Sequence, residues 1–222
     1  MKVLSSDNLQ KIGGVSAIIS AGSYIFALGL LMTMMTPLTD SNIGFVEYMT
    51  FLIANQQLNF VWNFLIYIVH GATLVILVLA YYERLKDASP RLALVGTAFG
   101  FIWTGLILLS GFICISGTEA LITLYNKQPG QAEIFKILLN NLTYGIDISD
   151  RYLGSIWVAL LSVAAWKNRS FPFYANIVGV ALSVSALAAG LLLPISNTTG
   201  SLIFGMGVLV WWIITGIYML RK

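Results

Sequence analysis

Six long apolar stretches constrain this chain more than any other feature of its sequence. They cover residues 12–35, 58–82, 92–116, 146–166, 173–193 and 201–220. A helix that crosses a bilayer needs roughly 20 mostly apolar residues, and each stretch is near or above that length. Charged residues make up only 9% of the 222 residues, against about 25% in typical soluble proteins. The sequence therefore predicts an all-α integral membrane protein, in which residues 1–222 form one domain, a six-transmembrane-helix bundle.

The segments between the stretches fall into two kinds. The connections at 83–91, 167–172 and 194–200 are short and polar, which predicts tight turns between antiparallel neighbours. Residues 36–57 and 126–145 are longer and carry apolar side chains at helical spacing. They are predicted to form two short amphipathic segments that lie in the interface on the outer face. The alternative is that each segment lengthens the span beside it.

The charged residues are sorted by sign between the two sides of the predicted bundle. With a cytoplasmic N-terminus, nine of the twelve Lys and Arg residues are cytoplasmic: Lys2, Lys11, Arg84, Lys86, Arg91, Lys167, Arg169, Arg221 and Lys222. Six of the nine acids are then on the outer side: Asp40, Glu47, Glu119, Glu133, Asp147 and Asp150. This distribution follows the positive-inside rule. It predicts an N-in/C-in, multi-pass protein, with the lipid bilayer as its partner.

The composition also excludes several classes of function. No basic stripe is present to follow nucleic-acid phosphates, which excludes nucleic-acid binding. The chain has one cysteine, Cys114, and one histidine, His70, so it has no Cys/His cluster that would bind a metal and no pair of histidines for a haem. It has no phosphate-binding loop and no nucleophile elbow. The sequence thus predicts no cofactor and no metal site, and it does not favour an enzyme.

The second stretch carries a polar stripe along one side of the predicted helix. At about 100° per residue, seven polar residues share an arc of roughly 120°: Gln56, Asn59, Asn63, Tyr67, His70, Thr73 and Tyr81. Polar groups at membrane depth face protein or water, because lipid exposure is costly. One interpretation is the polar wall of a ligand cavity, with Asn59, Asn63, Tyr67 and His70 as binding residues. The other is that these side chains hydrogen-bond neighbouring helices and hold the bundle together.

Aromatic and acidic residues suggest the remaining parts of such a cavity. Trp62 and Trp103 are predicted binding residues that form its floor together with Trp211 and Trp212, unless these rings only pack the core. Glu119, Asp147 and Asp150 form either an acidic mouth for a cation or an amine, or an interfacial cluster of salt bridges that includes an Asp147–Arg151 pair.

Small residues predict where helices approach closely. Gly96 and Gly100 form a Gly-x-x-x-Gly pair in the third stretch, and the fifth and sixth stretches carry small residues at similar spacing. Such faces pack within a bundle or dock against a second copy or another membrane protein.

Three short motifs resemble a known family. They are Lys11-Ile12-Gly13-Gly14, Ser89-Pro90-Arg91-Leu92-Ala93-Leu94, and Arg169-Ser170-Phe171-Pro172 followed by Ile177-Val178-Gly179. In these motifs the chain resembles the bacterial membrane proteins grouped as domain-of-unknown-function 4386. The resemblance implies a six-span inner-membrane fold, and the family supplies no established reaction.

The leading functional hypothesis is that the bundle binds a small apolar or amphipathic ligand in an intramembrane cavity around His70. The alternative is a structural or partner-binding module, with a homo-oligomer as one form. A small-solute transporter is the third hypothesis.

Overall fold

The computed structural model describes residues 6–40, 42–192 and 199–221, and within these ranges every regular element is a helix. The elements are α1 (Ser6–Thr33), the 3₁₀ turn η2 (Thr36–Leu38), α2 (Phe45–Ala54), α3 (Gln56–Asn63), the π-helical turn η3 (Phe64–Val69), α4 (His70–Leu85), α5 (Pro90–Lys127), α6 (Pro129–Asn168), α7 (Phe173–Leu192) and α8 (Thr199–Arg221). The prediction of an all-helical protein is confirmed for the described residues. Lys2, Lys222 and most of the 194–200 turn lie outside them.

Four helical segments are long and apolar enough to cross a membrane: Asp7–Thr33, Gln56–Leu85, Pro90–Lys127 and Leu202–Arg221. They coincide with four of the six predicted stretches, so this is a membrane protein. The other two stretches are also helical, as the second half of α6 and as α7.

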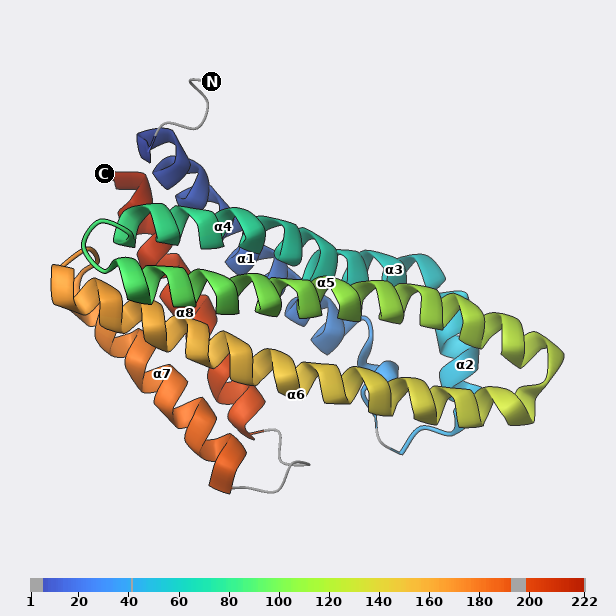
Figure 1. The fold of residues 1–222 in the computed structure, drawn as a ribbon. Coiled ribbons are helices and arrows are strands. Elements are labelled where there is room, and N and C mark those ends of the chain that lie inside the picture. Colours follow the sequence, from blue (N-terminus) through green and yellow to red (C-terminus); the bar gives the residue numbers. More distant parts are fainter. Residues whose placement is uncertain (1–5, 41, 193–198, 222) are drawn as a thin grey trace.

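The longest elements, α5 and α6, run antiparallel through the whole length of the molecule (Figure 1). Both begin at a proline, which suits the first turn of a helix because its missing N–H needs no partner there. Their close approach depends on glycine. A Cβ added to Gly100 would lie 2.5 Å from Trp157 Nε1, and one added to Gly96 would lie 3.2 Å from Leu161 Cδ2. The predicted packing role of this glycine pair is therefore confirmed.

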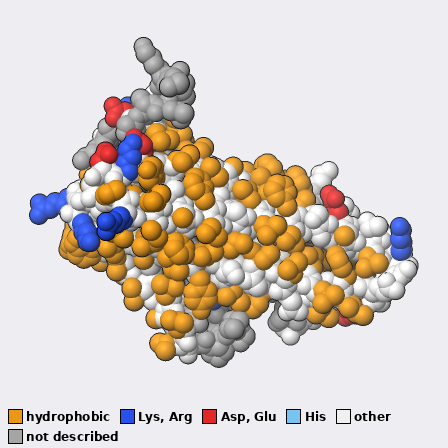
Figure 2. Space-filling model, viewed as in Figure 1, with side chains coloured by type: hydrophobic (Ala, Val, Ile, Leu, Met, Phe, Trp, Pro, Cys, Tyr) orange, Lys and Arg blue, Asp and Glu red, His pale blue; other side chains and the backbone are white. Residues whose placement is uncertain are grey.

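The other helices cover this pair over part of its length. Helix α1 packs against α4 and α8, and α7 packs against α6 and α8 (Figure 1). The first residues of α1 and the last residues of α8 lie near the α4–α5 and α6–α7 connections (Figure 1). We call this the basic end, because Lys and Arg side chains gather there, whereas hydrophobic side chains cover the flank of the molecule (Figure 2). We call the opposite end the α2 end.

Residues 126–145 differ from the prediction. They form no separate interfacial helix but continue α5 and α6, which is the alternative that the sequence left open. The reason is local: only Gln128 separates the two helices, and no proline follows Pro129 until Pro172. At 1.5 Å per residue, the 38 residues of α5 and the 40 of α6 extend about 57 and 60 Å, roughly twice a 30 Å hydrocarbon core.

Residues 36–57 agree better with the prediction, because α2 is a short separate helix of ten residues. Its buried residues, Met49 and Leu52, join Leu121 of α5 and Ala132 of α6 in a small second core. Helix α2 thus packs on the far halves of α5 and α6.

Candidate functional site

The helix that carries the polar stripe is not regular. Between α3 and α4 the backbone widens into the π-helical turn η3, which ends immediately before His70. The His70 N–H reaches back to the carbonyl of Leu65, five residues earlier. Turns of this kind are rare and are frequent at functional sites. The stripe residues on the two sides of η3 have different surroundings.

On the side toward the basic end, the stripe hydrogen-bonds neighbouring helices. The Thr73 hydroxyl lies 2.6 Å from the Ser20 hydroxyl of α1, and the Tyr81 hydroxyl lies 2.5 Å from Thr215 Oγ1 of α8. Here the residues hold the bundle together.

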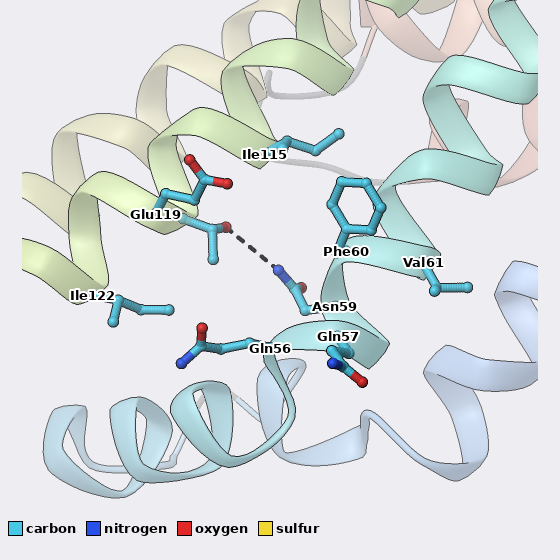
Figure 3. Close-up of a pocket in the computed structure, with 9 residues that line it drawn as sticks. Gln56, Gln57, Asn59, Phe60, Val61, Ile115, Glu119 and Ile122 are labelled. Carbon is cyan, nitrogen blue, oxygen red and sulfur yellow. Dashed lines mark hydrogen bonds between the residues drawn. The ribbon is translucent and has the colours of Figure 1, made fainter.

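On the side toward the α2 end, the stripe lines cavities instead. Asn59 and Gln56 border a pocket of about 390 Å³ between α3 and α5, which we call the lateral pocket (Figure 3). The Asn59 amide donates a long hydrogen bond, 3.4 Å, to Thr118 Oγ1. Glu119 also borders this pocket.

A second cavity, of about 290 Å³, lies next to it and is called here the α2-end cavity. It is lined by Asn59, Asn63, Trp62 and Tyr67 of the stripe helix and by Lys136 of α6, among others. The Trp62 indole N–H donates to the Ala27 carbonyl at 3.0 Å, and the Asn63 amide donates to the Asn59 carbonyl at 2.9 Å.

Lys136 and Tyr48 form the outer edge of the α2-end cavity. Lys136 Nζ lies 3.2 Å from the ring centroid of Tyr48 on α2. Burial lowers the pKa of Lys136 and raises the pKa of Tyr48. A partly desolvated ammonium over a ring is a favourable cation–π contact, so this pair helps to hold α2 on α6.

The third cavity, of about 350 Å³, lies among five helices and is called the central cleft. Its lining residues are Tyr24 of α1, Tyr67 of η3, His70 of α4, Trp103 and Ile107 of α5, Tyr144, Asp147, Asp150 and Arg151 of α6, and Phe204, Gly205, Val208 and Trp212 of α8. Trp103, Trp212 and Phe204 are buried and form the floor, whereas Tyr144 and Asp147 are exposed and mark the mouth. The cleft therefore has an apolar floor and a polar mouth.

His70 lies deep in this cleft, with 2% of its surface exposed. Its ring is surrounded by aromatic rings, with centroid distances of 5.3 Å to Tyr24, 4.9 Å to Trp212 and 6.5 Å to Trp103. Its Nδ1 atom is buried and has no hydrogen-bond partner among the described residues. A buried polar atom without a hydrogen-bond partner destabilises the fold by roughly 1–3 kcal/mol. A bound molecule that hydrogen-bonds to Nδ1 would remove this penalty.

Asp147 and Asp150 lie one turn apart on α6 and face the same cleft. The Ser110 hydroxyl hydrogen-bonds to Asp147, and the Trp103 indole N–H donates to Asp150. No ion pair joins Asp147 to Arg151 in the described part of the chain, so the predicted intrahelical pair is wrong. The Arg151 side chain is buried and its guanidinium carbon lies 5.4 Å from the Tyr152 ring centroid.

The structure brings together only part of the predicted site. His70, Tyr67 and Trp103 line the central cleft, and Trp212 joins them. Asn59, Asn63 and Trp62 line the two neighbouring cavities, and Trp211 stacks on Tyr81 in the core instead. Glu119 lines the lateral pocket, apart from Asp147 and Asp150.

Sequence reasoning did not identify Tyr24, Tyr144, Phe204 or Gly205 as residues of this site. Tyr24 follows Ser16, Ser20 and Ser23 at helical spacing, and this signal on the first stretch was not used. The spacing of Asp147 and Asp150 was a usable signal, because residues three apart share a helix face.

The chemistry of the cleft depends on which side chains line it. No group of three His, Cys, Asp or Glu side chains in the described residues is arranged to hold a metal ion. Its lining joins the polar groups of His70, Asp147, Asp150 and Arg151 to aromatic and aliphatic side chains, and small-molecule sites also combine apolar walls with placed polar groups. Neither a family model nor a curated protein nor a solved structure matches this chain.

Proposed function

We propose that this chain is a six-span, N-in/C-in protein of the bacterial inner membrane that binds a small apolar or amphipathic molecule in the central cleft. The observation that carries the proposal is His70 Nδ1, which is buried at the cleft and has no hydrogen-bond partner in the part of the chain that the structure describes. The hydrocarbon part of the ligand would pack against the aromatic rings beside His70. A donor or acceptor on the ligand would satisfy the imidazole.

The position of the cleft supports access from the outer side of the membrane. Asp150 lies 18 residues before Asn168, the end of α6 at the basic end, which is about 27 Å along the helix. A bilayer core is about 30 Å thick. With the basic end in the cytoplasm, the acids lie near the outer boundary of the hydrocarbon core, and the ends of α5 and α6 that carry α2 extend beyond it.

The small-residue faces supply less support for the alternative of a partner-binding module. A Cβ added to Gly179 would lie 2.0 Å from Ser162 Oγ, and one added to Gly207 would lie 2.9 Å from Leu182 Cβ. These small-residue faces thus already pack against other helices of the same chain.

Transport of a small solute remains the third hypothesis, and one observation favours it. The second span changes from α-helical to π-helical at η3 beside His70, and turns of this kind are frequent at functional sites. Binding in the cleft is the common requirement of both hypotheses, so it is tested first.

Gly205 offers the sharpest test of the binding site. It lines the cleft, and a Cβ added there meets no atom within 4 Å. Gly205→Leu therefore adds a bulky side chain at the wall of the cleft, at a position where its Cβ has open space. Gly105→Leu is the matched control, because Gly105 also meets nothing within 4 Å but does not line the cleft.

The probe is a brominated dodecanol, whose bromine quenches the fluorescence of nearby tryptophans such as Trp103 and Trp212. We expect saturable quenching in the wild type and in Gly105→Leu, and only the linear background of the detergent or lipid in Gly205→Leu. If saturable quenching survives in Gly205→Leu, the central cleft is not the binding site.

A further inference from the structure

We infer that the ligand of the central cleft is an amphipathic amine, whose ammonium group lies beside Asp147 and Asp150 and whose hydrocarbon lies on Trp103 and Trp212. This inference rests on the proposed function and adds the chemical class of the ligand.

The charge of the cleft favours a single cation. Two carboxylates, Asp147 and Asp150, and one guanidinium, Arg151, line it, which leaves a formal charge of −1 with His70 neutral. A buried or half-buried charge is stable when an opposite charge pairs with it. A monovalent cation brings the sum to zero, whereas an anion would double the imbalance.

Arg151 lines the cleft with the two acids but forms no salt bridge with either of them among the described residues. Its guanidinium carbon lies 5.4 Å from the ring centroid of Tyr152, and Nη1 lies 3.4 Å from the position of a Cβ on Gly200, at the start of α8. The guanidinium thus packs toward α8, and among the described residues no salt bridge of the chain pairs Asp147 or Asp150 with a cation.

His70 is a second and independent indication of a ligand. Only 2% of the surface of His70 is exposed, and its Nδ1 atom has no hydrogen-bond partner among the described residues. Neutral imidazole has one N–H and one nitrogen lone pair, and in the tautomer that carries its proton on Nε2, Nδ1 accepts an N–H from a primary ammonium. A hydrocarbon alone would leave this atom unsatisfied.

The aromatic floor fits both parts of such a ligand. Trp103 and Trp212 are nearly parallel, with a centroid distance of 6.0 Å and an interplanar angle of 18°. Indole faces attract cations at their negative face and also pack against alkyl chains. Because Trp103 donates its N–H to Asp150, the acid and the ring are held in one fixed arrangement.

The test compares two probes that differ only in the head group, a brominated dodecylamine and the brominated dodecanol. The protein is placed in nanodiscs of phosphatidylcholine, whose zero net charge avoids collecting amine at the surface. Binding is followed by tryptophan quenching. The variants are Asp147→Asn and Asp150→Asn, and Glu119→Gln is the matched control because that acid lines the lateral pocket.

We expect the wild type and Glu119→Gln to bind the amine about tenfold or more tightly than the alcohol, as a charge-assisted contact predicts. Each Asp→Asn variant should lose about tenfold for the amine and keep its affinity for the alcohol. Retained alcohol binding also shows that the variant is folded. A third arm adds phosphatidylethanolamine to the discs: weaker amine binding identifies a lipid head group as the source of the amine, and unchanged binding identifies a free amine.

Equal affinities for the two probes, or an amine preference that survives both Asp→Asn variants, would overturn the inference and leave the proposed function standing. If neither probe binds saturably, the proposed function fails as well.

Discussion

Gly154 on α6 tests whether the floor of the central cleft is packed as tightly as the structure shows. A Cβ added there would lie 2.6 Å from Phe204 Cζ and 2.7 Å from Trp103 Cε2. Carbon atoms in contact prefer about 3.5–4.0 Å, so both rings must retreat by about 1 Å. Overpacking of this kind costs about 1–3 kcal/mol. The better helix propensity of alanine returns at most about 1 kcal/mol.

Gly154→Ala is therefore expected to lower the free energy of unfolding by about 1 kcal/mol. The control, Gly105→Ala, gains the same propensity with open space around its methyl group, and should raise stability by up to about 1 kcal/mol. For a chain of this size, 1 kcal/mol corresponds to about 2–4 °C in Tm. The two variants should thus differ by several degrees in a thermal-shift measurement on detergent-solubilised protein. Equal Tm values would refute the close contact between α6 and α8 at this point.

Three other substitutions test separate parts of the molecule. His70→Phe should raise Tm, because it replaces a buried nitrogen that has no hydrogen-bond partner by an apolar ring. It should also weaken quenching by the amine probe. A lower Tm would contradict the assignment of Nδ1 as an unsatisfied buried atom. Tyr81→Phe should lower stability by about 0.5–1.5 kcal/mol, because it removes the hydroxyl contact with Thr215, and unchanged thermal stability would show that this contact contributes nothing. Lys136→Met should increase hydrogen exchange in residues 45–54, because α2 loses the cation–π contact with Tyr48, whereas exchange in α4 serves as the unchanged reference.

The long helices and the polar stripe could be predicted because both depend on local sequence. Apolar length defines a membrane helix, and seven polar residues at helical spacing define one face. The end of α5 and the first half of α6 could not be separated from an interfacial helix on the same grounds, because a surface helix and the extension of a long helix share the same periodicity. Only packing against α2, through Met49 and Leu52, distinguishes the two arrangements.

The composition of the central cleft depends on contacts between distant residues, which no spacing in the sequence encodes. Tyr24, Trp103 and Phe204 belong to three different helices and meet only after the bundle forms. The sequence showed Asp147 and Asp150 as a pair three residues apart, but it did not show which side chains of other helices lie beside them. Glu119 seemed equally suited to that mouth, yet it lies along α5 at the lateral pocket.

The π-helical turn explains why the two halves of the polar stripe have different surroundings. In a regular α-helix, Asn63 and His70 are seven residues apart and differ in direction by about 20°. A turn that closes over five residues instead of four adds one residue to the helix, and rotates everything after it by about 100°. The residues before η3 therefore face the cavities at the α2 end, and Thr73 and Tyr81 after it face α1 and α8. His70 lies at the junction, where it lines the central cleft and its Nδ1 atom has no hydrogen-bond partner among the described residues.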